Sequence, residues 1–189
     1  MTTANKLTLS RMALIPIMIV FVSIQSLSNQ LLFFDMSVAQ FVFAVLFVLA
    51  AFTDFLDGYI ARKYHQVTSF GKFLDPIADK LLVVVALLYL MQIMPNRVPL
   101  WTVSIVIFRE FLVTGIRLLA IEKGILIVAS PFGKIKTAST MVALILLLFN
   151  DFGLSPLMGN ILYYFAIAMT LISGLDYFIK NKKSILETL

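Results

Sequence analysis

Six long apolar segments dominate this sequence, at residues 12–28, 38–60, 74–94, 99–121, 135–150 and 158–179. Each is close to the ~20 residues that a helix needs to cross the hydrocarbon core of a bilayer, and the fifth is the shortest. Helices are the expected form, because a helix satisfies its own backbone hydrogen bonds in lipid. Since 61% of the residues are hydrophobic and only 13% are charged, we predict an all-α, polytopic membrane protein with six transmembrane helices. Residues 1–189 are expected to form one domain.

The N-terminal residues lead to two further expectations. Ala4–Ser10 precedes the first apolar segment, and Leu7 and Leu9 are placed to face lipid, so a short interfacial helix is expected there. Basic residues before an apolar stretch also describe a secretory signal peptide. Because residues 24–32 show no small-residue cleavage motif, we expect a retained first helix instead.

The basic residues predict how the helices are oriented. If six helices alternate, fourteen of the fifteen lysines and arginines fall toward one face, and only Arg97 falls toward the other. The positive-inside rule then places both termini and both basic loops in the cytoplasm. The net charge of +5 is therefore attributed to membrane topology and not to a nucleic-acid partner. The sequence has no cysteine and one histidine, which excludes thiolate and multi-histidine metal centres.

Four aspartates lie at the cytoplasmic ends of the second and third segments, namely Asp54, Asp57, Asp75 and Asp79. The first two are three residues apart and the last two are four apart, so each pair shares one helix face. Carboxylates near lipid are costly, and four of them within 26 residues repel each other unless some take up protons. Divalent cations resolve this repulsion, since gathered oxygen ligands suit Mg²⁺ or Mn²⁺. The pattern indicates metal-assisted chemistry on a phosphate-bearing substrate at the membrane surface.

Small residues accompany the aspartates. Gly58 avoids a clash between the backbone and a bulky ligand, Gly71 permits a close approach, and Ala61 keeps its helix face open. Pro76 suits the first turn of a helix, where its missing N–H is not needed. Asp75 is then expected near the N-cap of the third helix, where the helix dipole favours a carboxylate.

The aspartates could instead have either of two different roles. They could be interfacial acids in ion pairs with nearby cations, at Arg62, Lys63, Lys72 and Lys80. They could also serve as the relay of a cation- or proton-coupled carrier. A carrier would place its acids across the bilayer depth or at broken helices, whereas these acids cluster at helix ends, which disfavours it.

The run forms the pattern Asp54-x-x-Asp57-Gly58-x-x-Ala61-Arg62 and, after eight residues, Gly71-x-x-x-Asp75-x-x-x-Asp79. This pattern resembles the signature of the CDP-alcohol phosphotransferases in every element, and the resemblance covers nearly the whole chain. It implies six transmembrane helices around a polar cavity open to the cytoplasm, usually in a homodimer. It further implies that the four aspartates hold two divalent ions, Mg²⁺ or Mn²⁺, which bind the pyrophosphate of a CDP-linked lipid. Asp79 resembles the proposed catalytic base, although spacing alone does not choose among the aspartates.

Cations for a phosphorylated acceptor alcohol occur outside this run. Arg109 and Arg117 are eight residues apart and can share a helix face. Lys134 and Lys136 open the fifth segment, where helix N–H groups and the dipole favour an anion. Arginine at membrane depth needs a partner, and the adjacent Glu110 is not expected to face the same way. Ordinary membrane anchoring of the lysines and a structural ion pair at Arg109 are the alternatives.

Four segments are similar to those of family members in bacterial inner membranes that use sn-glycerol 3-phosphate, namely residues 5–11, 70–82, 109–110 and 133–139. One departure is Thr140, where that similarity leads us to expect glutamine. The resemblance implies phospholipid synthesis from CDP-diacylglycerol and sn-glycerol 3-phosphate among membrane lipids; inositol phosphate and serine remain alternative acceptors. The implied CDP-lipid-binding residues are Asn5, Thr8, Asp57, Gly58, Ala61, Arg62 and Gly71, with Arg11 near the mouth of the site. The predicted acceptor-phosphate residues are Arg109, Arg117, Lys134 and Lys136.

Overall fold

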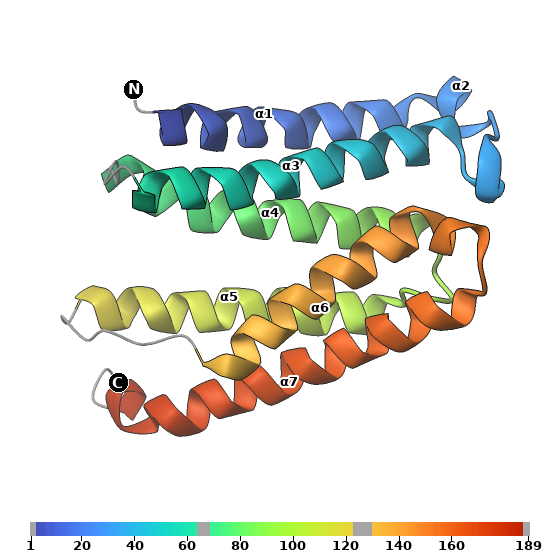
Figure 1. Cartoon of the computed structure of the whole chain (residues 1–189). Coiled ribbons are helices and arrows are strands. Elements are labelled where there is room, and N and C mark those ends of the chain that lie inside the picture. The colour runs from blue at the N-terminus through green and yellow to red at the C-terminus, as the bar shows by residue number, and fades with distance from the viewer. Residues whose placement is uncertain (1–2, 64–68, 123–129, 187–189) are drawn as a thin grey trace. The chain divides into compact units, whose positions relative to one another are not determined.

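The computed structural model describes residues 3–63, 69–122 and 130–186, and the side chains of residues 9–53, 77–117 and 130–181. Within these ranges the chain is helical apart from turns, connecting residues and an isolated bridge between Leu31 and Ser37 (Figure 1). The elements are α1 (Thr3–Ser23), α2 (Gln25–Ser28), η1 (Phe33–Asp35), α3 (Val38–Lys63), α4 (Ser69–Ile93), α5 (Leu100–Glu122), α6 (Pro131–Leu148), η2 (Asn150–Gly153) and α7 (Pro156–Leu186). The all-α prediction is confirmed for this part of the chain, and a helix lies at each of the six apolar segments.

Length and composition single out two helical stretches as able to cross a membrane among the residues described. These are Pro131–Leu148 and Pro156–Asn181, and shorter apolar helices cover Leu9–Ser23 and Val38–Thr53. Many large apolar side chains on the helices are exposed, including Leu100, Phe108 and Ile179. Such exposure is expected of a protein whose helices face lipid.

The chain divides into two compact units. The first unit comprises Met1–Leu90 and Ile145–Ser155, and the second comprises Met91–Leu144 and Pro156–Leu189. In the first unit, α1 packs along α3 (Figure 1). The rings of Phe43 on α3 and Tyr89 on α4 lie 4.5 Å apart between centroids, so α4 packs against α3 as well.

The turns η1 and η2 also pack together in the first unit. Asn150 donates a hydrogen bond from Nδ2 to the Phe34 carbonyl at 2.7 Å. Gly153 has a φ of +73°, and a Cβ there would clash with the Phe34 ring. Glycine is therefore favoured at this position by backbone conformation and also by the close approach of the Phe34 ring.

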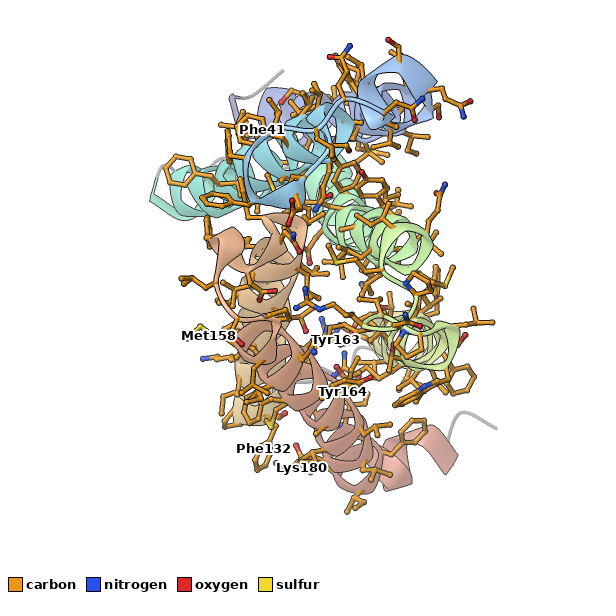
Figure 2. The ribbon with its side chains drawn as sticks, turned by 90° about the vertical axis from the view of Figure 1, so that its right-hand side faces the viewer. Phe41, Phe132, Met158, Tyr163, Tyr164 and Lys180 are labelled. Atoms are coloured by element: carbon orange, nitrogen blue, oxygen red, sulfur yellow. The ribbon has the colours of Figure 1, made fainter. Side chains whose placement is uncertain are left out.

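In the second unit, α5 packs against α7 through paired polar and aromatic side chains. The hydroxyls of Thr102 and Tyr163 lie 2.6 Å apart and share a hydrogen bond. Tyr164 follows on α7 (Figure 2), and its ring lies 6.3 Å from that of Trp101. The shared hydrogen bond satisfies the buried hydroxyls of both Thr102 and Tyr163 inside an apolar interface.

Two sequence predictions about helix ends are wrong. The separate short helix over Ala4–Ser10 is absent, because α1 runs unbroken from Thr3 to Ser23. The third long helix starts at Ser69, so Asp75 and Pro76 lie inside α4 and not in its first turn. Proline inside a helix is tolerated in membrane proteins, since neighbouring groups can satisfy the freed carbonyl; α1 likewise contains Pro16.

Candidate active site

The acidic run lies on a hairpin of two antiparallel helices in the first unit. α3 ends at Lys63 and α4 begins at Ser69, so only five residues of sequence separate them. The C-terminal end of α3 and the N-terminal end of α4 therefore lie at the same end of the hairpin (Figure 1). The two aspartates of α3 precede that end, and the two aspartates of α4 follow it.

The packed rings of Phe43 and Tyr89 fix how the two helices are aligned along their axes. Asp57 lies fourteen residues after Phe43, and Asp75 lies fourteen residues before Tyr89. Asp54 and Asp79 lie eleven residues after Phe43 and ten before Tyr89. At a rise of about 1.5 Å per residue, the two members of each cross-helix pair lie at nearly the same height. This register brings all four aspartates to one short section of the hairpin.

These four aspartates fit a divalent-ion site by their donor chemistry and their helix register. Carboxylate oxygens are the ligands that Mg²⁺ and Mn²⁺ prefer. Asp79 is half-buried on α4, and the side chains of Asp54, Asp57 and Asp75 lie outside those described. The described side chains alone contain no group of three or more potential metal ligands, so the metal site remains a prediction.

The predicted CDP-lipid residues come from the two helices of the hairpin and from α1. Asn5 and Thr8 lie in the first turns of α1, near its N-terminus. Gly58, Ala61 and Arg62 lie near the end of α3, and Gly71 lies near the start of α4, at the end of the hairpin that carries the aspartates (Figure 1). The side chains of these six residues are not among those described, so their contacts remain predictions.

Arg11 is the one predicted mouth residue whose side chain is described. It lies on α1 and is fully buried. A buried guanidinium requires compensating polar or charged groups, because charge taken out of water is costly. Its burial places a cationic side chain within the packed interior of the first unit.

In the second unit, three helices bring charged and polar side chains together. Arg109 donates from Nη1 to Glu110 Oε1 at 2.8 Å, and Lys136 donates from Nζ to the same oxygen at 2.5 Å. Arg109 also donates from Nη2 to Ser173 Oγ at 3.1 Å. The side chains of Arg109, Glu110 and Lys136 are only 15%, 12% and 8% exposed. We call these four residues the cationic cluster, because its two cations and one carboxylate leave a net charge of +1.

The pairing of Arg109 with Glu110 corrects the sequence prediction that neighbouring residues on a helix cannot face the same way. The prediction considered the directions of the Cβ atoms. Arginine and glutamate are long enough to bend toward a common side, and the lysine on α6 attracts the carboxylate there. The ion-pair partner that a buried arginine needs is therefore its own neighbour in sequence.

Small and hydroxyl-bearing residues of α6 and α7 lie next to residues of the cationic cluster. A Cβ on Gly174 would lie 3.3 Å from Arg109 Cγ, so this glycine lets the arginine stem lie close to α7. Ser139 and Thr140 donate to the Lys136 carbonyl at 3.0 and 2.8 Å. Thr140, the departure from the expected glutamine, is thus buried and bonded to the backbone of α6.

The other two residues predicted to bind the acceptor phosphate, Arg117 and Lys134, take no part in the described hydrogen bonds of the cationic cluster. Arg117 and Lys134 are exposed, and among the described contacts no ion pair joins either of them to the cationic cluster. The structure therefore brings together Arg109 and Lys136 from the predicted set. Sequence reasoning assigned no role to Glu110 or Ser173, although charge balance at membrane depth was a signal for the glutamate.

Comparison with known proteins identifies the family. The family model of the CDP-alcohol phosphatidyltransferases matches residues 1–172. This chain belongs to the CDP-alcohol phosphatidyltransferase family. The matched residues include both helix ends that carry the aspartates and the α5 and α6 members of the cationic cluster.

Several relatives of this CDP-alcohol phosphatidyltransferase family member bear the same name, CDP-diacylglycerol–glycerol-3-phosphate 3-phosphatidyltransferase. The Bacillus subtilis (strain 168) protein is 42% identical over 182 residues, which cover 94% of this chain and 93% of that protein. A Rickettsia bellii protein is 42% identical over 184 residues, covering 95% and 94%. A Salmonella choleraesuis protein is 33% identical over 187 residues, covering 96% and 95%. The resemblance stated from the sequence is confirmed.

Proposed function

We propose that this protein transfers the phosphatidyl group of CDP-diacylglycerol to sn-glycerol 3-phosphate, giving phosphatidylglycerophosphate and CMP. The observation that carries this proposal is the 42% identity to the Bacillus subtilis protein of that name over 94% of this chain. Agreement over almost the full length of both proteins supports a shared reaction and not merely a shared fold.

The donor half of the reaction is assigned to the aspartates of α3 and α4. Asp54, Asp57, Asp75 and Asp79 would hold two ions, Mg²⁺ or Mn²⁺. Such ions neutralise a pyrophosphate and stabilise the attacking and leaving oxygens of an in-line displacement. Gly58, Ala61 and Gly71 would leave room for the cytidine part. Asn5, Thr8 and Arg62 would bind the rest of the CDP-lipid head group.

The proposed transfer forms one phosphorus–oxygen bond and breaks another. A hydroxyl oxygen of the acceptor attacks the phosphorus of the phosphatidyl group, and the bond from that phosphorus to the bridging oxygen breaks. CMP carries that oxygen away, and the acceptor hydroxyl gives its proton to Asp79. A carboxylate that lies beside metal cations is a weak base, so the proton would move late in the displacement.

The acceptor half is assigned to the cations of the second unit. Arg109 and Lys136 lie in the cationic cluster, and Lys134 and Arg117 would add exposed charge for the phosphate of the acceptor. Charge-assisted bonds from arginine and lysine are the expected means of holding a phosphomonoester. An acceptor without a phosphate, such as serine, would leave these cations unused, and this favours glycerol 3-phosphate or inositol phosphate.

We further propose the membrane arrangement that the sequence predicted. The chain would cross the bacterial inner membrane six times, as one domain with a polar cavity open to the cytoplasm. Both termini and the aspartates would lie on the cytoplasmic side, as the distribution of lysine and arginine indicates. A homodimer is expected by resemblance to the family.

The test is an assay of the purified, full-length protein in lipid nanodiscs that contain CDP-diacylglycerol. Glycerol 3-phosphate, inositol phosphate, serine and glycerol are offered separately, and the lipid product and CMP are quantified by mass spectrometry. We expect phosphatidylglycerophosphate and CMP in equal amounts from glycerol 3-phosphate alone. Chelation should abolish both, and Mg²⁺ or Mn²⁺ should restore them.

Two results would contradict the proposal. Faster CMP release with inositol phosphate or serine would keep the reaction class and replace the acceptor. Cation or proton flux into proteoliposomes, with no CMP release from any acceptor, would replace the enzyme with a carrier.

A further inference from the structure

The carboxylate of Glu110 fixes the distance between two cationic groups in the second unit. The bonds from Arg109 Nη1 and Lys136 Nζ end on the same oxygen, at 2.8 and 2.5 Å. The two nitrogens therefore lie within about 5.3 Å of each other, the sum of those lengths. Two donors at such a separation can both reach the oxygens of a single phosphate.

The bonds to Glu110 leave further donors on both cations. Arg109 uses Nη1 on Glu110 and Nη2 on Ser173, and its buried Nε has no hydrogen-bond partner within the described part of the chain. The ammonium group of Lys136 carries three donors, and its bond to Glu110 occupies one of them. The carboxylate thus holds the two side chains in place without exhausting their capacity to bind an anion.

Electrostatics explains why a carboxylate is needed between them. Two cations this close and this buried repel each other, and burial strengthens the repulsion by lowering the local dielectric. Without a shared anion, the flexible lysine would move away from the guanidinium. The bond of Arg109 to Ser173 and the space at Gly174 fix the arginine against α7, so Lys136 depends most on Glu110.

We propose that Glu110 is a positioning residue for the acceptor phosphate. It holds Arg109 and Lys136 at a spacing that one phosphomonoester can bridge, and it neutralises one of the two charges while no acceptor is bound. This inference rests on the proposed function, because it concerns the acceptor of that same reaction. Glu110 itself touches neither the substrate nor the reacting atoms.

The first test is a comparison of Michaelis constants in Glu110→Gln. Glutamine keeps the shape and one acceptor oxygen but loses the charge that attracts both cations. We expect the KM for glycerol 3-phosphate to rise roughly tenfold or more, by analogy with residues that orient metal ligands. The KM for CDP-diacylglycerol should stay within about twofold of the wild-type value, since lost positioning affects only the acceptor.

The matched control is Asp176→Asn. This substitution also removes one carboxylate charge from an ion pair of the second unit, the bond of 2.8 Å from Lys180 to Asp176 on α7. Asp176 has no assigned part in the reaction. Both Michaelis constants should therefore be those of the wild-type protein.

The second test is a double-mutant cycle with Lys136→Met. If Glu110 acts by positioning Lys136, the effect of Glu110→Gln on the KM for glycerol 3-phosphate should shrink to about threefold or less in the Lys136→Met background. A merely structural glutamate would give the same ratio in both backgrounds. If Glu110→Gln alone folds poorly, the double variant can still be measured, because it has no unpaired lysine at this site.

The inference is overturned if Glu110→Gln lowers or leaves unchanged the KM for glycerol 3-phosphate, or raises both Michaelis constants equally. It is also overturned if the effects of the two substitutions multiply without coupling. A wild-type protein that makes no phosphatidylglycerophosphate would instead overturn the proposed function, so the two failures are distinct.

Discussion

The aspartate hairpin of the first unit and the cationic cluster of the second unit handle charge in opposite ways. The hairpin carries four aspartates, whose helix positions lie at nearly one level by the register of Phe43 and Tyr89. The cationic cluster combines two cations with one carboxylate, and hydrogen bonds join both cations to it. A site of like charges depends on an added ligand of opposite charge, whereas a site of mixed charges is held by the protein's own contacts.

The largest expected effect is on the site of like charges. Asp57→Asn and Asp79→Asn should each reduce turnover by more than ~100-fold, since even residues that only orient metal ligands cost 10- to 100-fold. CMP release by purified protein at saturating Mn²⁺ measures this loss. Near-normal turnover in both variants would defeat the two-metal arrangement. Asp35→Asn, at an aspartate of η1 outside the acidic run, is the control and should retain wild-type turnover.

Substitution in the cationic cluster should lower the stability of the folded protein. Glu110→Ala leaves two buried cations without their shared anion, and breaking a buried pair in this way costs about 3–5 kcal/mol. We expect a clear fall in the apparent Tm of the purified protein in detergent. Asp176→Ala breaks a more exposed pair and should lower stability by no more than about 1 kcal/mol. Equal shifts in the two variants would show that the cationic cluster contributes nothing special to folding.

A smaller effect is expected from a cation outside the buried bonds. Lys134 is exposed, so Lys134→Ala should leave folding intact and remove only long-range attraction for the acceptor phosphate. The KM for glycerol 3-phosphate should rise about threefold, and the rise should vanish at high ionic strength, where exposed charges are screened. An increase in the KM for CDP-diacylglycerol instead would assign Lys134 to the donor.

The smallest effect concerns a single methyl group. In Gly174→Ala the new Cβ would lie 3.3 Å from Arg109 Cγ, so the arginine must shift by a few tenths of an ångström. We expect the KM for glycerol 3-phosphate to rise about twofold, because small displacements of a positioning group weaken binding. Gly115→Ala on α5 is the matched control, since a Cβ there meets nothing within 4 Å. Identical kinetics in the two variants would show that Gly174 has no part in placing Arg109.

The sequence predicted the positions of the helices, because the length of an apolar segment and the turn residues at its ends are local features of the chain. The six apolar segments match α1 and α3 to α7, but the predicted boundaries differ from the observed ones. Pro76 suggested a helix start, but α4 begins seven residues earlier, at Ser69. Proline restricts only its immediate neighbours, so it could not report that helix continues on its N-terminal side.

The candidate site was predictable only in part, for a related reason. Spacing singled out the aspartates, and the structure places them near the same end of the α3–α4 hairpin, whereas their binding of metal ions stays a prediction. The cationic cluster could not be assembled, since Ser173 and Lys136 reach Arg109 and Glu110 through tertiary packing of three helices. Backbone geometry alone also predicted the wrong direction for the Glu110 side chain, because the bending of long side chains does not follow from residue spacing.

Whether the aspartate hairpin holds two ions can be read from a titration of the purified protein with Mn²⁺, followed by electron paramagnetic resonance in the presence of CDP-diacylglycerol. We predict two bound ions per chain in the wild-type protein, and weaker or incomplete binding in Asp57→Asn and in Asp75→Asn. Binding of Mn²⁺ that is identical in number and affinity in the wild-type protein and both variants would contradict the two-metal arrangement.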